Sequence, residues 1–339
     1  TVVLVGQSDA PDAPRYLVDV FHVVGGAMHD YLLHAQAPEE ASPAVFDAQG
    51  VELQPVAGAS SLLDLTSGAG EREGYEHIRE LRSGQTSRPW EARWRIGGKR
   101  DLILRLIRLP ESRETVFVGQ APGHRKGSIR TNMRKLTKLV CRREGQADLH
   151  STFASVIEAH PQSRPRITRA TRRKTEGNEE GGVVAVEVTH DRGCDLIIVA
   201  REPGRVSVPG RGVAFDGRVA VVSLDPAGAL LRAAMVEGRQ LLVGKTRIDG
   251  PAATVSGNVL THPDGVATNA LYERNAVVNV DVPVPPDAVG KLVRVRHRDG
   301  VRSTWTIEEV EPGEGRHCRI TLDRPARLGI GRLNSIGAD

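Results

Sequence analysis

The most informative stretch of the sequence is Arg15-Tyr-Leu-Val-Asp-Val-Phe-His-Val-Val-Gly-Gly-Ala-Met-His-Asp-Tyr-Leu-Leu-His34. Two runs rich in Val, Leu, Tyr and Phe flank Gly25 and Gly26, and this pattern is typical of a β-hairpin with a primed turn. A Gly-Gly pair tolerates the positive φ angles that such a turn requires. The pattern therefore predicts that residues 15–23 and 28–35 are antiparallel neighbours that turn at the two glycines.

The predicted register gathers polar side chains on one face of the hairpin. His22 lies directly opposite His29 in this register, and the next pair along the same face includes Tyr31. A slip of one residue would move the two histidines to opposite faces, so the pairing is a sharp test. Three polar positions side by side are unusual for a plain core strand. We therefore interpret His22, His29, Tyr31 and His34 as candidate substrate-contact residues, with a buried polar network as the alternative.

A metal site in this hairpin is not expected. Directly opposed strand residues have Cβ atoms about 5 Å apart, close enough for His22 and His29 to share one ion. No third ligand lies beside them, however, and the chain contains no His-x-His pair. The sequence therefore predicts no metal ligands.

Short apolar runs punctuated by Gly, Pro and Asp recur along the rest of the chain, and no long stretch has the apolar period of a helix. Residues 229–236 are rich in Ala and Leu but lie between turn signals, so we expect a strand there rather than a helix. The prediction is an all-β chain, most simply an antiparallel β-sandwich. The other runs interpreted as strands of the sandwich are 101–109, 114–118, 151–158, 182–189, 195–200 and 218–223.

A change of composition near residues 244–257 indicates a domain boundary. We expect a β-sandwich over residues 1–243 and a small β-domain over residues 244–339. Four runs of the second domain have strand character, with prolines between the first two. They are 276–282, 291–297, 303–310 and 318–322.

The remaining composition limits the protein class. The three cysteines, Cys141, Cys194 and Cys318, are few and widely spaced, which predicts free thiols rather than a disulfide framework. No run approaches the roughly 20 apolar residues of a transmembrane helix, so no membrane partner is expected. The chain opens directly on a strand-like run, Thr1-Val-Val-Leu-Val5, and we expect it to be a piece of a larger protein. Its compartment stays open.

Positive charge is concentrated in two runs, although the net charge is only +4. Aromatic residues make up 4% of the chain, and none lies within either basic run, whereas single-stranded nucleic acids are bound largely by aromatic stacking. Arginine forks suit the carboxylates or sulfates of an acidic polysaccharide better, so nucleic acid is an unlikely partner. The runs consist of Arg125, Lys126, Arg130, Arg134, Lys135, Lys138, Arg142 and Arg143, and of Arg164, Arg166, Arg169, Arg172, Arg173 and Lys174.

A short basic loop lies between Gly123 and Gly127. Its residues His124, Arg125 and Lys126, together with Arg130, are the candidate anion-binding residues. A solvated loop without a ligand is the alternative. The catalytic patterns GxSxG, P-loop and HExxH are absent, which argues against the corresponding hydrolase and nucleotide-binding classes.

Two phrases resemble the late β-sandwich region of the heparinase II/III-like polysaccharide lyases. The first runs from Val18-Asp-Val-Phe21 through the Gly-Gly pair to His29-Asp-Tyr31 and ends at His34. The second is Ser151-Thr-Phe-Ala-Ser-Val-Ile-Glu158. The similarity covers residues 1 to about 240, and the tail is compatible with it.

The resemblance implies a specific chemistry for the intact protein. Lyases of this family cleave uronate-containing chains by β-elimination, in which a neutralised carboxylate acidifies the adjacent C–H and a Tyr or His base removes the proton. The family's catalytic residues lie mainly in an N-terminal helical toroid. Further ones lie in an earlier sandwich segment, which also holds a structural zinc.

Neither that earlier sandwich motif nor a toroid occurs in this sequence. The resemblance therefore implies no catalytic residue and no cofactor in this chain, which would be inactive alone. It implies an acidic polysaccharide and the missing toroid as partners, and a periplasmic or secreted parent protein. The alternative from another class is a non-catalytic β-sandwich module that binds polyanions.

Overall fold

The protein is described by a computed structural model. The residues that the structure describes are 1–6, 14–35, 45–66, 74–96, 102–122, 135–178, 182–250, 257, 259–261, 277–296, 302–313, 315 and 317–322. The chain divides into two compact units, Thr1–Gly250 and Pro251–Asp339. The first unit ends after the predicted boundary at Val243, because the residues beyond Val243 form one more strand of the same sheet.

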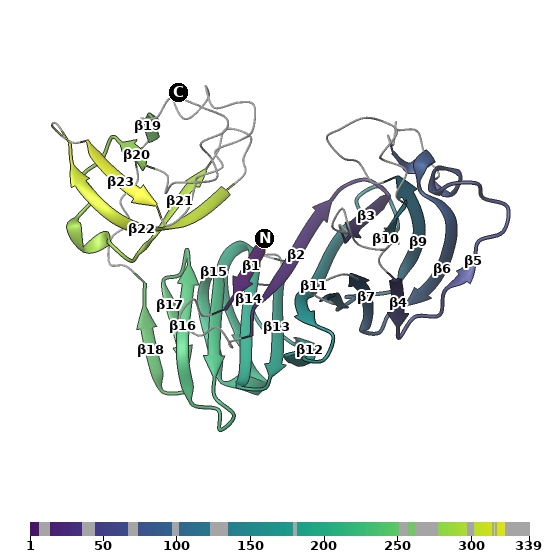
Figure 1. The fold of residues 1–339 in the computed structure, drawn as a ribbon. Helices are drawn as coiled ribbons and strands as arrows, with labels where there is room; N and C mark the ends of the chain where they lie inside the picture. The colour runs from purple at the N-terminus through teal and green to yellow at the C-terminus, as the bar shows by residue number, and fades with distance from the viewer. Residues whose placement is uncertain are drawn as a thin grey trace. The chain divides into compact units, whose positions relative to one another are not determined.

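Two sheets of the first unit face each other as a sandwich, and all their strand pairs are antiparallel (Figure 1). In spatial order, sheet I consists of β1 (Val2–Val5), β2 (Tyr16–Val24), β11 (His150–Pro161), β8 (Leu102–Arg108), β7 (Trp90–Ile96) and β4 (Val45–Gln49). Sheet II consists of β3 (Met28–His34), β10 (Lys135–Glu144), β9 (Glu114–Pro122), β6 (Arg79–Thr86) and β5 (Gln54–Pro55).

A third sheet completes the first unit, and Figure 1 shows it in green. In spatial order, sheet III consists of β12 (Ile167–Arg173), β13 (Val183–His190), β14 (Gly193–Val208), β15 (Val213–Leu224), β17 (Gln240–Val243) and β18 (Thr246–Asp249), while β16 (Leu230–Val236) also pairs with β15. The segment 229–236 is therefore a strand, as predicted. Residues from both halves of β14, such as Leu196 and Val206, share one apolar cluster with Leu241. Both halves of this long strand therefore contribute to one core of sheet III.

Sheet I is buried on both faces because its strands alternate between two cores. Val18 and Val20 of β2 pack with Val186 and Ile197 of sheet III. The other face of sheet I packs against sheet II around Trp90, Trp94, Leu106, Leu139 and Phe153. The outer face of sheet II is covered by the segment that carries the short 3₁₀ helices η1 (Leu62–Leu65) and η2 (Tyr75–His77).

The second unit has one described sheet with its own small core. In spatial order its strands are β19 (Val259–Thr261), β20 (Val277–Val280), β23 (Cys318–Leu322), β22 (Arg302–Pro312) and β21 (Leu292–Arg296). The 3₁₀ helix η7 (Pro286–Ala288) lies at the predicted proline bend. A further short 3₁₀ helix, η5 (Pro209–Arg211), lies in the first unit, between β14 and β15. Val278, Trp305, Ile320 and Leu322 form the core of this unit. The predicted all-β, antiparallel fold class is confirmed.

The predicted hairpin between β2 and β3 is wrong. β2 pairs with β1 and β11 in sheet I, whereas β3 pairs with β10 in sheet II. Gly25 and Gly26 do have positive φ angles, 86° and 79°, but they carry the chain across the sandwich from one sheet to the other. Backbone bonds from Gly25 N to Leu149 O (2.9 Å) and from Leu149 N to Gly26 O (3.0 Å) hold this crossing. The glycines have the positive φ angles that the sequence predicts, but they connect strands of two different sheets rather than two neighbouring strands of one sheet.

All three cysteines are free thiols. Among the helices that the structure describes, none is long and apolar enough to span a membrane.

Candidate functional site

The four predicted substrate-contact residues do not converge on one site. His22 and His29 bond to adjacent residues of β11, Thr152 and Ser151, whose side chains point to opposite faces of sheet I. His22 therefore faces sheet III, and His29 lies inside the sandwich of sheets I and II. The one-face arrangement of the two imidazoles is wrong because the hairpin that would produce it does not form.

His29 is a structural residue of the Gly-Gly crossing. Its side chain is buried, its Nε2 lies 2.5 Å from the carbonyl oxygen of Gly25, and its Nδ1 lies 2.8 Å from Ser151 Oγ. A carbonyl only accepts, so Nε2 donates and Nδ1 accepts from the serine hydroxyl. Both ring nitrogens are therefore used in holding the crossing.

Tyr31 is likewise fixed in the core. Its hydroxyl donates to Asp19 Oδ2 at 2.9 Å, and its ring stacks on Phe153 with 5.8 Å between centroids. Burial and the nearby Asp19 carboxylate raise the pKa of Tyr31. The phenol is neutral and already donating, so it lacks the properties of a general base in this arrangement.

His34 lies apart from these residues on the outer face of sheet II. It is exposed and stands opposite Lys138 of β10. Partial burial, and then the Lys138 charge, lower the pKa of His34. The other predicted group, His124, Arg125, Lys126 and Arg130, falls outside the described residues.

One pair of charges that the sequence analysis missed lies deep in the sandwich. Arg108 and Glu114 are both buried and bonded, with Arg108 Nη2 to Glu114 Oε2 at 2.8 Å. Trp90 Nε1 donates to the same carboxylate at 3.0 Å, and the guanidinium lies 5.3 Å from the centroid of Tyr31. The guanidinium of Arg108 and the carboxylate of Glu114 both have partners here. The pair therefore stabilises the core and has no unused hydrogen-bonding group for a ligand.

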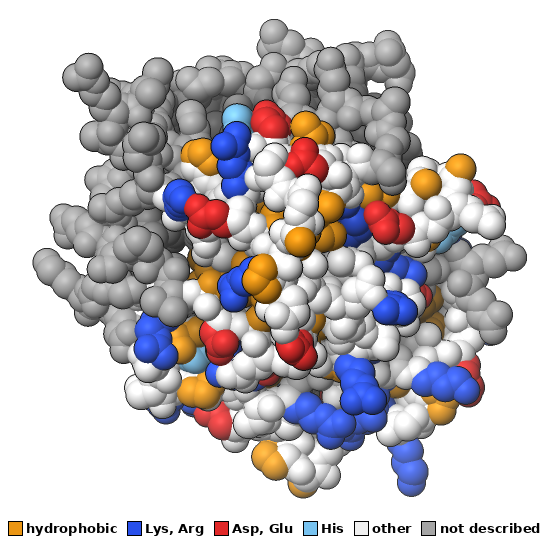
Figure 2. Space-filling model, turned by 90° about the vertical axis from the view of Figure 1, so that its right-hand side faces the viewer, with side chains coloured by type: hydrophobic (Ala, Val, Ile, Leu, Met, Phe, Trp, Pro, Cys, Tyr) orange, Lys and Arg blue, Asp and Glu red, His pale blue; other side chains and the backbone are white. Residues whose placement is uncertain are grey.

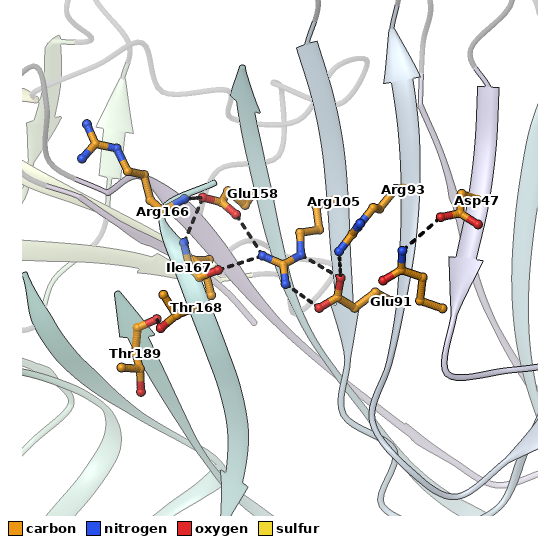
Figure 3. Close-up of polar contacts among 10 residues, drawn as sticks. Asp47, Glu91, Arg93, Arg105, Glu158, Arg166, Ile167, Thr168 and Thr189 are labelled. Atoms are coloured by element: carbon orange, nitrogen blue, oxygen red, sulfur yellow. Dashed lines mark hydrogen bonds and ion pairs between the residues drawn. The ribbon is translucent and has the colours of Figure 1, made fainter. Parts of the chain in front are cut away.

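A second polar network joins sheet I to the edge of sheet III (Figure 3). Arg105 donates from Nε to Glu91 at 3.0 Å and from Nη1 to the carbonyl of Ile167 at 2.8 Å. Glu158 Oε1 accepts the backbone N–H groups of Arg166 and Ile167 at 2.7 and 3.2 Å. An arginine and a carboxylate thus cap the free edge of β12, as a neighbouring strand would. This network explains why the first residues of β12 are fixed against sheet I.

The strongest candidate site is an arginine-rich cluster where the three sheets of the first unit meet. We call it the Arg172 cluster, and its carboxylate is Glu111, in the connection 109–113 between β8 and β9. Glu111 is paired with Arg143 Nη1 of sheet II at 3.2 Å and with Arg172 Nη2 of sheet III at 3.4 Å. The cluster consists of His22, Glu111, Arg143, Arg172 and Arg201.

His22 and Arg201 extend the cluster on the side of β13. A Cβ atom built on Gly182 would lie 3.6 Å from His22 Nδ1 and 3.4 Å from Arg201 Cβ, so these side chains flank the same glycine. Burial lowers the pKa of His22 to about 4, and the charges of the N-terminus, Arg201 and Arg172 act in the same direction while Glu111 opposes them. The imidazole is therefore neutral at pH 7.

Two atoms of the cluster are buried without a hydrogen-bond partner, His22 Nε2 and Arg172 Nη1. An unpaired buried polar group costs about 1–3 kcal/mol, and more when it is charged, so such atoms are rare in folded proteins. Burial also lowers the pKa of Arg172. Glu111 opposes this shift, whereas Arg108 and Arg143 add to it, but a guanidinium keeps its proton. The cluster thus combines excess positive charge with unused hydrogen-bonding capacity.

Part of this cluster is predictable from the sequence. Arg143 and Arg172 belong to the two predicted basic runs, and His22 was a candidate contact residue, whereas Glu111 and Arg201 were missed. Other members of the second run have partners of their own, as in the pairs of Arg166 with Asp191 and of Arg173 with Glu187. No spacing in the sequence marks Glu111 as the carboxylate that both arginines share.

The face of the molecule drawn in Figure 2 carries side chains of both charges. Figure 2 shows positive and negative side chains interspersed across the middle of that face, with basic ones gathering toward its lower edge. Among the described residues, no group of three or more His, Cys, Asp or Glu side chains is placed to hold a metal ion. No protein-family model matches the chain, and no curated protein matches it.

Proposed function

We propose that this chain is a β-sandwich module that binds acidic polysaccharides and belongs to a lyase that cleaves uronate-containing chains. The observation that carries the proposal is the Arg172 cluster, in which two arginines from different sheets, Arg143 and Arg172, share the single carboxylate of Glu111. Guanidinium groups bind carboxylates through paired N–H donors, and uronates present such carboxylates along the polymer.

The described residues favour a glycan over a nucleic acid. Phe21 is the sole aromatic among the exposed large hydrophobic side chains of the described chain, and it has no counterpart with which to form a stacking surface for bases. A module that binds any polyanion by charge alone is the second candidate, because the two basic runs would support it equally.

The module's part in catalysis follows from the placement of its candidate bases. His29 and Tyr31 are buried and fully engaged in hydrogen bonds, which supports a chain that binds substrate while other parts of the parent protein perform the β-elimination. We expect no turnover by the isolated chain with alginate, hyaluronan or heparin, measured as absorbance of the unsaturated uronate product. Robust turnover would overturn this division of roles.

Binding itself is tested by titration of the chain with polygalacturonate, hyaluronan, heparin, neutral dextran and DNA over a series of salt concentrations. We expect binding to the acidic glycans that weakens steeply with salt, because counterions are released, and no binding to dextran. Equal salt-corrected affinity for DNA would favour the general polyanion module, and the absence of binding to every acidic glycan would reject the proposal.

A further inference from the structure

We propose that Glu111 is an internal substitute for a ligand carboxylate, and that a uronate carboxylate displaces it from Arg172 to reach Arg172 Nη1 and His22 Nε2. The inference rests on the proposed function and assigns its binding group.

The chemistry of the cluster selects a carboxylate. Glu111 already presents one oxygen to Arg143 and the other to Arg172, so a planar carboxylate is the group that these arginines accommodate. The two unpartnered atoms, Arg172 Nη1 and His22 Nε2, add a charged donor and a neutral ring nitrogen to the same cluster. An incoming carboxylate would accept from the guanidinium and, with the imidazole proton on Nε2, from His22 as well.

Glu111 is the member of the cluster most easily displaced. Its side chain is 41% exposed, against 14% for Arg143 and 24% for Arg172. Its bonds of 3.2 and 3.4 Å lie at the long end for charge-assisted hydrogen bonds, which are usually about 2.7–2.9 Å. Buried Arg108 and Glu114, by contrast, are joined at 2.8 Å. Since the unpartnered atoms are shielded from solvent, a ligand reaches them only after a neighbouring side chain moves. Glu111 is held by two long contacts and can be that side chain.

Removing the competitor should therefore tighten binding. We expect Glu111→Gln to raise the affinity for polygalacturonate and hyaluronan by about threefold to tenfold, the range set by the loss of two partly exposed ion pairs. Asp191→Asn is the matched control, because Asp191 is also a partly exposed carboxylate, 44% exposed, paired with an arginine of the same basic run, Arg166. It changes the net charge equally and should produce only the small general effect of charge.

Removing the paired N–H donors of Arg172 should weaken binding. Arg172→Lys keeps the positive charge but loses the paired donors, and we expect about a tenfold loss of affinity. Arg173→Lys is the neighbouring control, because Arg173 is engaged with Glu187 on the opposite face of β12. Dextran sulfate, which carries sulfates and no carboxylate, should respond to these variants less than polygalacturonate does.

The outcomes separate this inference from the proposed function. If the wild-type chain binds acidic glycans but Glu111→Gln behaves like Asp191→Asn, or Arg172→Lys behaves like Arg173→Lys, the glycan binds elsewhere and the inference fails alone. Failure of the wild-type chain to bind any acidic glycan rejects both.

A measurement on the unmodified chain avoids any effect of substitution on folding. Polygalacturonate should shift the NMR resonances of the His22 imidazole and raise the pKa of His22. The positive charges of the N-terminus, Arg201 and Arg172 disfavour the protonated ring, and a uronate carboxylate bound in place of Glu111 would stabilise it. Unchanged His22 resonances at saturating polygalacturonate would also overturn the inference.

Discussion

His22 and His29 bond to adjacent hydroxyls of β11, yet the hydrogen bonds available to each ring make their roles different. His29 uses both ring nitrogens to hold the crossing of the chain, whereas His22 bonds only Thr152 and keeps a buried Nε2 without a partner. A histidine with both nitrogens engaged is part of the framework. A histidine with one unengaged buried nitrogen beside arginines is a group whose protonation and ligand contacts can change.

The lowered pKa of His22 predicts a specific pH dependence of stability. The unfolded chain titrates His22 near pH 6.5, and the folded chain at about 4. Between these values the unfolded state binds more protons, so this contribution is complete above pH 6.5 and is lost as the pH falls toward 4. We expect His22→Gln to lose less unfolding free energy than the wild type across this window. Urea unfolding of both proteins at a series of pH values measures this difference in unfolding free energy.

Above pH 6.5 the difference between the two proteins should not depend on pH. Burial opposes the ionised form of Glu187, but Arg211 and Arg173 lower its pKa from 4.5 to about 2, so its contribution is lost as the pH falls from about 4.5 toward 2. Both proteins contain Glu187, so this loss cancels in their difference. Parallel stability curves for wild type and His22→Gln between pH 6.5 and 4 would contradict the burial of a neutral His22.

At the scale of elements, the sequence predicts where strands form better than it predicts which strands pair. Apolar alternation and turn residues act locally, so they place the runs 151–158, 182–189 and 229–236 correctly as strands. Besides the nearby β1, β2 pairs with β11, about 130 residues away in the chain, where His22 meets Thr152. A Gly-Gly pair suits a hairpin and a crossing between sheets equally, because both need positive φ angles.

The candidate site depends on even more distant contacts. The density of basic residues is visible in the sequence and includes Arg143 and Arg172, but their common partner Glu111 becomes apparent only when sheets I, II and III are stacked. Buried charges such as Arg108 are also hidden, because alternation alone cannot tell an arginine facing solvent from one facing a glutamate inside the sandwich.

The crossing at Gly25 and Gly26 gives a prediction at the same scale. A Cβ atom at either position would meet no atom within 4 Å, so substitution tests the backbone conformation alone. The left-handed region costs an L-residue about 1–2 kcal/mol, and we expect Gly25→Ala and Gly26→Ala each to destabilise the protein by about that amount in urea unfolding.

Gly210→Ala is the matched control for the crossing. Gly210 also has open space around its Cβ position but no positive φ, so alanine there should be neutral or slightly stabilising, by up to about 1 kcal/mol. Equal effects at Gly25 and Gly210 would show that the crossing does not require the left-handed conformation.

At the scale of the whole molecule, the apolar cores are divided between the two units in the described chain. The clusters around Val18, Trp94 and Leu241 lie entirely within residues 1–250, and the cluster around Trp305 lies within the second unit. Each unit therefore buries its own apolar residues, which is the usual condition for independent folding of a domain.

This division predicts that residues 1–250 fold alone with the urea midpoint of the first unit in the full chain. Ending the chain at Val243, the boundary expected from composition, should lower the stability, because β17 would lose its pairing with β18 and the core would lose Ile248. Fully burying an isoleucine side chain contributes about 1.5–3 kcal/mol. Ile248 is only partly buried, so we expect the shorter chain to be less stable than residues 1–250 by about 1–2 kcal/mol. Identical midpoints for the two truncated chains would place the boundary at Val243 after all, whereas failure of residues 1–250 to unfold cooperatively would show that the first unit depends on the second.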